Sequence, residues 1–351
     1  MITIVNTIFL LADEYCSKKI KYKDIHCERF IDFIITNRII GIAFDNLIKK
    51  SLPKKVYIDI KALYENDKNK TDNFKENLIY ISYMLKNIDI DYALLKGAFL
   101  ITHLYPKGHR TSNDIDILVN GEDISKIQDA LLENGFVQGY YSKQDGITTA
   151  TRKEIVESRM NFGETIPFIK MINEKPLIID INFSVDFKPS TNNIVKNFLN
   201  NVIEINYEDM FFKTLNHVDF IIHLCCHLYK EATTYDWVLP KYDLMLYKFS
   251  DINVFLHEFG CKDYFLKLLE RIKCFEVEKE CYYTFENASI IYPKINNIEG
   301  FESFMKGFKL ESLDFMRQIT YPREKKLYRH NMNFKDWFFC ENRVSQLEEI
   351  V

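Results

Sequence analysis

The sequence predicts an α+β protein in which a mixed β-sheet is flanked by N- and C-terminal helical regions. Two observations lead to this class. Apolar residues recur at spacings of three and four before residue 89 and again after residue 200, as they do on helices. Between these parts, short apolar or alternating runs are separated by Gly, Pro and Asn, as is typical of strands. We therefore expect a helical region at 1–88, a core at 89–205 and a helical region at 206–351.

The N-terminal region is expected to end in a long helix. Pro53 marks a boundary, and helical spacing continues over 56–85. The middle of this segment, 65–77, is strongly polar, so the sequence leaves two alternatives, one continuous helix or a break there.

The core is expected to alternate strands with short helices. The predicted order is a strand at 92–95, a short helix at 98–104, a strand at 114–119, a helix at 123–133 capped by Gly135, and strands across 148–185 that include a hairpin of 166–172 and 177–185. After the core, helices are predicted at 209–229, 243–249, 254–259 and 264–275. We expect a sheet of five or six strands within one continuous body.

Two aspartates on one predicted strand indicate chemistry with cations. Asp114 and Asp116 are separated by one residue, so their side chains point to the same face of an extended chain. Two like charges at that distance are unfavourable unless a cation or basic group compensates them. A third acid, Asp180, lies among apolar residues on a later strand. Magnesium prefers such oxygen ligands, and paired carboxylates suit two-metal phosphoryl transfer.

A glycine precedes the acidic pair at a loop's distance. Gly97 has no Cβ, so its backbone could approach a phosphate closely. Lys96 and Arg110 carry positive charges that could neutralise a triphosphate. The sequence therefore predicts a phosphate-binding turn beside the acids.

The stretch LLKGAFLITHLYPKGHRTSNDIDILV, residues 94–119, resembles the signature of the DNA polymerase beta-like nucleotidyltransferase superfamily. More narrowly, it resembles a group of bacterial nucleotidyltransferase family proteins that often neighbour biosynthetic genes. It is also similar to abortive-infection toxin nucleotidyltransferases, which act on tRNA. The segment 209–249 looks like the C-terminal region of the bacterial group, and 250–351 carries no resemblance.

This resemblance implies a polymerase beta-like sheet and a nucleotidyltransferase activity. Asp114 and Asp116 would hold two Mg²⁺ ions, for which Mn²⁺ could substitute. Asp180 would complete the catalytic metal site and help deprotonate the acceptor. The reaction would move a nucleoside monophosphate from an NTP, with ATP expected, to a hydroxyl of a small molecule, peptide or protein, releasing pyrophosphate. The expected NTP-binding residues are Lys96, Gly97, Ala98, Arg110, Ser112, Asn113, His223, His227, Lys230 and Asp243.

One departure from the superfamily pattern concerns Ala98. Many members carry Ser or Gly at this position, and a serine hydroxyl would help to hold the terminal phosphates. Ala98 leaves only its backbone amide for that purpose. A catalytically silent nucleotide-binding protein is therefore one alternative, and a toxin-like enzyme acting on tRNA ends is another.

Several candidate residues keep more than one interpretation. His223 and His227 share a helix face at a spacing of four, which suits a nucleotide- or acceptor-facing pair, a packed core pair or a zinc site. Lys230 and Asp243 either face the triphosphate or are ordinary surface charges. The sequence leaves these alternatives open.

Composition and motifs exclude several other classes. A net charge of −4 disfavours a globally basic nucleic-acid binder, which counts mildly against tRNA as the acceptor. Neither a P-loop nor a dinucleotide-binding glycine pattern occurs, and no nucleophile elbow is present. No apolar run approaches the roughly 18 residues that span a bilayer. Eight scattered cysteines and the lack of an export signal predict reduced thiols in the cytoplasm and no membrane partner.

Overall fold

The chain divides into two compact units. The computed structural model describes residues 7–25, 29–185, 193–208 and 210–351. The first unit comprises Met1–Lys68, Gly108–Arg110 and Ile221–Val351, and the second comprises Asn69–Lys107 and Thr111–Phe220. The two predicted helical regions therefore both contribute to the first unit.

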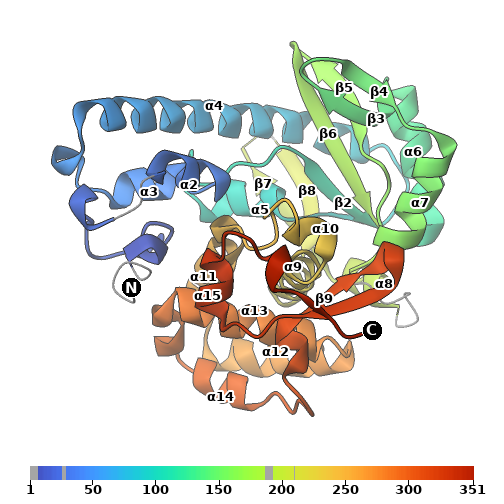
Figure 1. The fold of residues 1–351 in the computed structure, drawn as a ribbon. Helices are drawn as coiled ribbons and strands as arrows, with labels where there is room; N and C mark the ends of the chain where they lie inside the picture. Colours follow the sequence, from blue (N-terminus) through green and yellow to red (C-terminus); the bar gives the residue numbers. More distant parts are fainter. Residues whose placement is uncertain (1–6, 26–28, 186–192, 209) are drawn as a thin grey trace. The chain divides into compact units, whose positions relative to one another are not determined.

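A mixed sheet of eight strands is the centre of the second unit (Figure 1). Its order is β4-β3-β5-β6-β2-β1-β8-β7. The strands are β1 (Tyr92–Leu94), β2 (Ile115–Val119), β3 (Val137–Ser142), β4 (Gly146–Thr149), β5 (Phe168–Ile172), β6 (Lys175–Asn182), β7 (Val202–Tyr207) and β8 (Met210–Leu215). β2 is parallel to β6, and β1 is parallel to β8, whereas the other neighbours are antiparallel. The predicted α+β class is confirmed, with more strands than expected.

Apolar residues from helices and strands form one core in this unit. Phe74, Leu78 and Ile81 of α4 (Lys54–Leu85) are buried in the same cluster as Ile117 and Ile181 of the sheet. Burying a side chain of this size contributes roughly 1.5–3 kcal/mol. The helix α6 (Ile124–Glu133) adds further apolar residues to the cluster and lies beside β3 in Figure 1. The core therefore fixes β2 and β6, which carry the predicted acids.

The hairpin predicted around residue 174 is confirmed. Asn173 and Glu174 connect β5 to β6 and have φ values of 49° and 62°. Two consecutive residues with positive φ form the turn that matches the twist of a two-stranded hairpin. Gly135, with a φ of 79°, follows the end of α6 as predicted.

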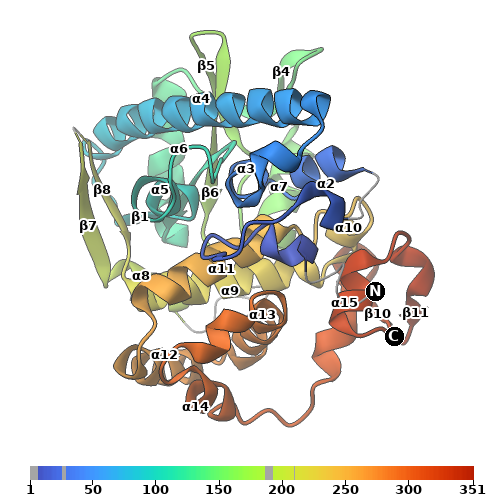
Figure 2. The ribbon, with the colours of Figure 1, turned by 90° about the vertical axis from the view of Figure 1, so that its left-hand side faces the viewer.

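Two predictions in the core were wrong. Strands were predicted throughout 148–185, but Arg152–Phe162 forms the helix α7, whose N-terminus has a capping box between Thr151 and Glu154. A helix was predicted over 209–229, but the hairpin of β7 and β8 at the sheet edge (Figure 2) precedes the helix α9 (His217–Ala232). Asp209, where that helix was expected to begin, lies outside the described residues.

The helix α4 is continuous, so of the two alternatives for 65–77 the structure shows the unbroken helix. Its 32 residues contain neither Gly nor Pro. Polar side chains alone do not interrupt backbone hydrogen bonding, whereas Gly and Pro carry the largest helical penalties. The polar middle of α4 therefore remains helical.

The first unit is mainly helical, with a small sheet that the sequence did not predict. Its helices, some of them visible in Figure 2, include α2 (Phe30–Thr36), α3 (Ile40–Asn46), α11 (Leu246–Phe259), α12 (Lys262–Cys274), α13 (Glu278–Ile291), α14 (Phe301–Lys306) and α15 (Phe334–Phe339). The segments predicted at 243–249 and 254–259 thus belong to one helix, α11. The small sheet has the order β11-β10-β9, from Glu348–Glu349, Lys326–Arg329 and Gln318–Tyr321.

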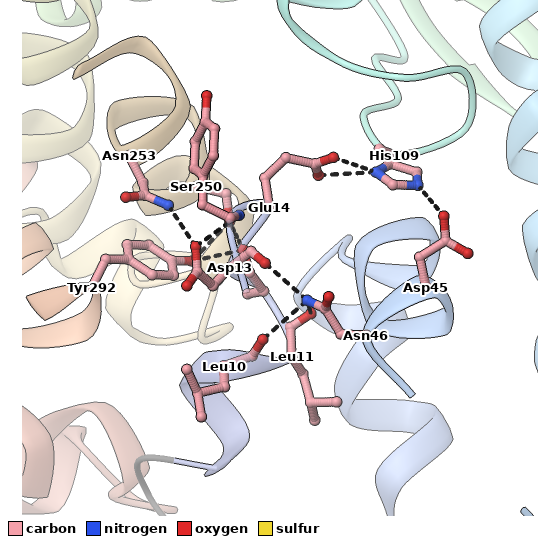
Figure 3. Close-up of polar contacts among 12 residues, drawn as sticks. Leu10, Leu11, Asp13, Glu14, Asp45, Asn46, His109, Ser250, Asn253 and Tyr292 are labelled. Atoms are coloured by element: carbon pink, nitrogen blue, oxygen red, sulfur yellow. Dashed lines mark hydrogen bonds and ion pairs between the residues drawn. The ribbon is translucent and has the colours of Figure 1, made fainter. Parts of the chain in front are cut away.

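A polar cluster joins distant segments of the first unit (Figure 3). The imidazole of His109 contacts Glu14 at 2.9 Å and Asp45 at 3.1 Å, one acid on each ring nitrogen. The side chain of Asn46 donates to the carbonyl oxygen of Asp13 at 2.8 Å, and Asn253 donates to the Asp13 carboxylate at 3.1 Å. These bonds attach the N-terminal segment to α3 and α11 without a ligand.

Candidate active site

Adjacent parallel strands place two of the predicted acids directly opposite each other. Asp116 of β2 is the register partner of Asp180 of β6. Paired residues on neighbouring strands point to the same face, and neighbouring strands are about 4.8 Å apart. Asp114 lies directly before this strand, and its charge acts on both Asp116 and Asp180. The second unit thus brings Asp114, Asp116 and Asp180 together.

The three acids and Glu164 form one region of like charge. Burial, and then the carboxylates of Asp114, Asp116 and Glu164, raise the pKa of Asp180 well above its usual range. Burial and the Asp114 carboxylate also raise the pKa of Asp116, although Lys96 opposes this. Within the described part of the chain, the buried Oδ1 atom of Asp180 has no hydrogen-bond partner. An unsatisfied carboxylate oxygen in a negative region is the environment that a cation would stabilise.

Lys96 supplies a positive charge inside this region. Its Nζ atom lies 2.6 Å from Oδ1 of Asp116, and both side chains are largely buried. The backbone of Lys96 has a φ of 40° and a ψ of −109° where β1 gives way to the helix α5 (Gly97–Phe99). Such a conformation costs a non-glycine residue about 1–3 kcal/mol and tends to occur at functional sites. The chain therefore accepts backbone strain at the lysine that contacts the acids.

Gly97 is explained by a close approach to Ser112. A Cβ atom at position 97 would lie 2.9 Å from the Cβ atom of Ser112, closer than real Cβ contacts. The Ser112 hydroxyl donates to Oδ1 of Asp114 at 2.9 Å. The glycine thus lets the loop before β2 pack against β1 and hold Asp114, while Asn113 is exposed at the same loop.

The backbone amide of Ala98 is already engaged. It donates to the carbonyl oxygen of Leu95 at 3.1 Å, and the Ala98 side chain is buried. The sequence leaves this amide available for a phosphate, whereas in the structure it closes the turn after β1. Phosphate binding at this turn would therefore depend on Lys96 and on the loop at Ser112.

The donor set fits a magnesium site. All three acids offer carboxylate oxygens, which Mg²⁺ prefers, and Asp180 has a buried oxygen without a partner. Among the described residues, no three His, Cys, Asp or Glu side chains are already arranged around a common metal position. Rotation of these carboxylates toward a shared cation is the change that binding would require.

The other predicted site residues belong to the first unit. Arg110 is buried, and its guanidinium contacts the Asp251 carboxylate through Nε at 3.0 Å and Nη2 at 3.0 Å. Asp243 is fully buried and forms an ion pair with Arg343. These two salt bridges account for the burial of both residues without a nucleotide.

The two predicted histidines stack in the first unit. The rings of His223 and His227 are 6.2 Å apart and nearly parallel. Nε2 of His227 lies 3.3 Å from Glu231, which also contacts Lys248 at 2.6 Å. Lys230 lies on the same helix and is half-buried. These contacts describe a packed polar layer of α9, and the nucleotide-facing interpretation stays a prediction.

Sequence reasoning missed Glu164 as part of the acidic region. It pairs with Asn182 in an isolated antiparallel bridge and follows Gly163, whose φ is 66° at the end of α7. Because α7 was not predicted, no pattern placed Glu164 next to β6. The capping box at Thr151 and the glycine at 163 were the signals that could have located it.

An acid-bearing mixed sheet with helical parts before and after it defines an α+β protein of the nucleotidyltransferase class. The family described as "Uncharacterised nucleotidyltransferase" matches residues 23–293, and the chain belongs to this family. Membership implies a transferase enzyme. Comparisons with curated proteins and with solved structures gave no match. Among the described helices, none has both the length and the apolar character needed to cross a bilayer.

Proposed function

We propose that this protein is a Mg²⁺-dependent nucleotidyltransferase of the polymerase beta-like type. It moves a nucleoside monophosphate from an NTP, with ATP as the donor, to a hydroxyl of a small molecule, peptide or protein. The observation that supports this most strongly is the register of β2 and β6, which sets Asp180 opposite Asp116 and next to Asp114.

The proposed reaction is an in-line displacement. The acceptor oxygen forms a bond to the α-phosphorus, the bond from that phosphorus to the bridging oxygen breaks, and pyrophosphate leaves. The proton of the acceptor hydroxyl passes to the Asp180 carboxylate, which lies opposite Asp116 in the sheet. Two Mg²⁺ ions, when held by Asp114, Asp116 and Asp180, would neutralise charge on the phosphates and the attacking oxygen.

The neighbouring residues have supporting roles in this proposal. Lys96 would release Asp116 and turn toward the triphosphate, because its Nζ atom already lies among the acids, 2.6 Å from Oδ1 of Asp116. Ser112 keeps Asp114 oriented through its hydroxyl. Most of the rate gain would come from positioning and charge neutralisation.

Label transfer from α-³²P NTPs tests the proposal. The purified protein is incubated with each NTP, Mg²⁺ and separate acceptor pools of small molecules, peptides, proteins and tRNA. The transfer rates of Asp116→Asn and Asp180→Asn should be lower than that of the wild type by a factor of about 10³ or more, because each substitution removes a carboxylate that the mechanism requires. Asp129→Asn, an exposed acid on α6, is the matched control and should keep full activity. Full transfer by Asp116→Asn would refute the mechanism.

Binding without turnover is the second candidate function. The engaged amide of Ala98 and the ion pair of Lys96 with Asp116 favour it, because both occupy groups that catalysis would need. Calorimetry that shows tight NTP binding, with no transfer in any acceptor arm, would support this alternative. Label on tRNA alone would instead support the toxin-like activity.

We propose the cytoplasm as the place of the reaction. The seven cysteines among the described residues are free thiols, in keeping with a reducing compartment. A tagged protein that fractionates with an export compartment would contradict this.

A further inference from the structure

A cavity in the C-terminal part of the first unit is lined by none of the candidate site residues described above. Its volume is about 380 Å³, within the range of pockets that hold small molecules. Its wall is built from α13, the turn at Asp314–Arg317, the end of β10 and α15. Much of this wall comes from residues after 293, beyond the part of the chain matched by the family.

Aromatic side chains give the cavity a rigid apolar wall. His330 and Trp337 stack face to face at 3.9 Å with an angle of 2° between their planes. Tyr282, Tyr283 and Phe334 add further aromatic surface. Such rings offer a large apolar contact to a ligand and lose little conformational freedom on binding.

Three buried polar atoms of residues in this wall lack hydrogen-bond partners within the described residues. They are Nδ1 of His330, a residue 4% exposed, Nδ2 of Asn287, a residue 2% exposed, and Nε of Arg329, which pairs with Asp314 through Nη2. Burial, and then the positive charge of Arg317, lower the pKa of His330 to about 4, so its ring is neutral near pH 7. A buried unsatisfied polar atom is costly, and such atoms in a cavity wall often find their partner in a ligand or bound water.

The charges that line the cavity are unequally paired. Arg329 and Asp314 bind each other at 2.7 Å. Across the described ranges, neither the Glu286 carboxylate nor the Arg317 guanidinium makes a hydrogen bond or ion pair with another side chain. One unpaired anion, which is partly buried, and one unpaired cation, which is exposed to solvent, therefore both line this space.

From this arrangement we infer that the cavity is a binding site for a small zwitterion with an apolar body, the chemistry of an amino acid. The ligand's carboxylate pairs with Arg317, its ammonium group pairs with Glu286, and its apolar part contacts the aromatic wall. A ligand with both charges satisfies both side chains, whereas a singly charged one leaves the other unpaired. This site goes beyond the proposed nucleotidyl transfer, and neither depends on the other.

Calorimetric titration of the full chain with three probes tests the inference. The probes are L-phenylalanine, 3-phenylpropanoate, which lacks the amine, and phenethylamine, which lacks the carboxylate. We expect L-phenylalanine to bind the wild type at least about tenfold more tightly than either analogue, because it alone makes both charge-assisted contacts.

Two substitutions separate the two contacts. Arg317→Ala should weaken the binding of L-phenylalanine and of 3-phenylpropanoate by about tenfold and leave the affinity for phenethylamine unchanged. Glu286→Gln should weaken the binding of L-phenylalanine and of phenethylamine and leave the affinity for 3-phenylpropanoate unchanged. The matched controls are Lys309→Ala and Glu311→Gln, which are exposed residues outside the cavity and should change nothing.

Tryptophan emission gives a second readout. The chain has two tryptophans, so Trp237→Phe leaves the signal of Trp337 in the cavity wall. Binding should change this emission with the same dissociation constant as the calorimetry. The inference is overturned if none of the probes binds saturably at millimolar concentration, if all three bind equally in every variant, or if binding leaves Trp337 emission unchanged.

Discussion

Ser112 occupies the space into which a side chain at position 97 would extend. The distance from an added Cβ at Gly97 to the Cβ atom of Ser112 would be 2.9 Å, and Phe74 closes the same space at 3.3 Å. The turn after β1 and the loop before β2 are therefore in contact through a residue that must be small. The hydroxyl of Ser112, the residue in this contact, donates a hydrogen bond to the Asp114 carboxylate.

Gly97→Ala should accordingly destabilise the protein by about 1–3 kcal/mol, the usual cost of overpacking. It should also lower transfer activity, because Ser112 must move and Asp114 moves with it. Urea unfolding and label transfer measure the two effects. Ser112→Gly in the same chain should recover part of the lost stability, and Gly121→Ala, where an added Cβ meets nothing within 4 Å, is the control. Equal costs at positions 97 and 121 would contradict the explanation.

Lys96→Met should destabilise the protein by about 3–5 kcal/mol in the presence of EDTA. The substitution leaves the buried Asp116 carboxylate beside other acids without its positive partner. Added Mg²⁺ should stabilise this variant more than the wild type, because a cation replaces the missing charge. Thermal unfolding with and without Mg²⁺ measures both effects.

Lys107→Met is the matched control for this lysine. Nζ of Lys107 lies 2.6 Å from the Asp72 carboxylate, the same distance as in the Lys96 pair. The side chains of Lys107 and Asp72 are, however, both about half exposed. An exposed pair contributes about 0–1 kcal/mol. If the two lysine variants lost the same stability, the buried pair of Lys96 and Asp116 would contribute no more to folding than the exposed pair.

Arg110 and Asp251 should behave as a buried ion pair. Arg110→Ala should cost about 3–5 kcal/mol because the buried Asp251 carboxylate loses the guanidinium that contacts it. The double variant Arg110→Met with Asp251→Leu should recover most of this loss, as measured by denaturant unfolding. The hypothesis that Arg110 also neutralises a triphosphate then predicts weaker ATP binding in the stable double variant. Unchanged ATP affinity would leave Arg110 a structural role only.

The contribution of His109 to stability should depend on pH. Burial lowers the pKa of His109, but the carboxylates of Glu14 and Asp45 outweigh it, so the folded-state pKa lies above the usual value of about 6.5. The protonated ring therefore stabilises the fold fully below about pH 6.5, and this stabilisation is lost as pH rises through the folded-state pKa.

His109→Gln should thus cost about 1.5–3 kcal/mol at pH 6, the range for hydrogen bonds with charged groups, and less at higher pH. Urea unfolding from pH 6 to pH 9 measures this trend. In a Glu14→Gln background the trend should be weaker, because one of the two acids is gone. A cost of His109→Gln that grew with pH would show that the sign of the shift is wrong.

The elements with strong local patterns were predictable from the sequence. The alternation around Asp114 located β2, and the apolar neighbours of Asp180 located β6, because side chains alternate with a period of two on a strand. The helix predicted over 209–229 covers both the strand β8 and the helix α9 that directly follows it. Where patterns of both periods adjoin, local spacing does not mark the boundary.

Pairing between distant segments could not be read from the sequence. The predicted convergence of the acids depends on β6 lying next to β2, and no local pattern specifies which strands are neighbours. The partners of Arg110 and Asp243 are likewise far along the chain, at Asp251 and Arg343. Both residues therefore resembled free charges in the sequence although each is buried in a salt bridge.

The register of β6 limits which insertions and deletions this protein can tolerate. Removing one residue between Leu177 and Asp180 would turn Asp180 into the apolar core and bring an isoleucine to the acidic face. The same change in the turn at Asn173 would alter only the tip of the hairpin. Length variation among active homologues, and in libraries that keep activity, should therefore be found at the hairpin tip and not within the strand.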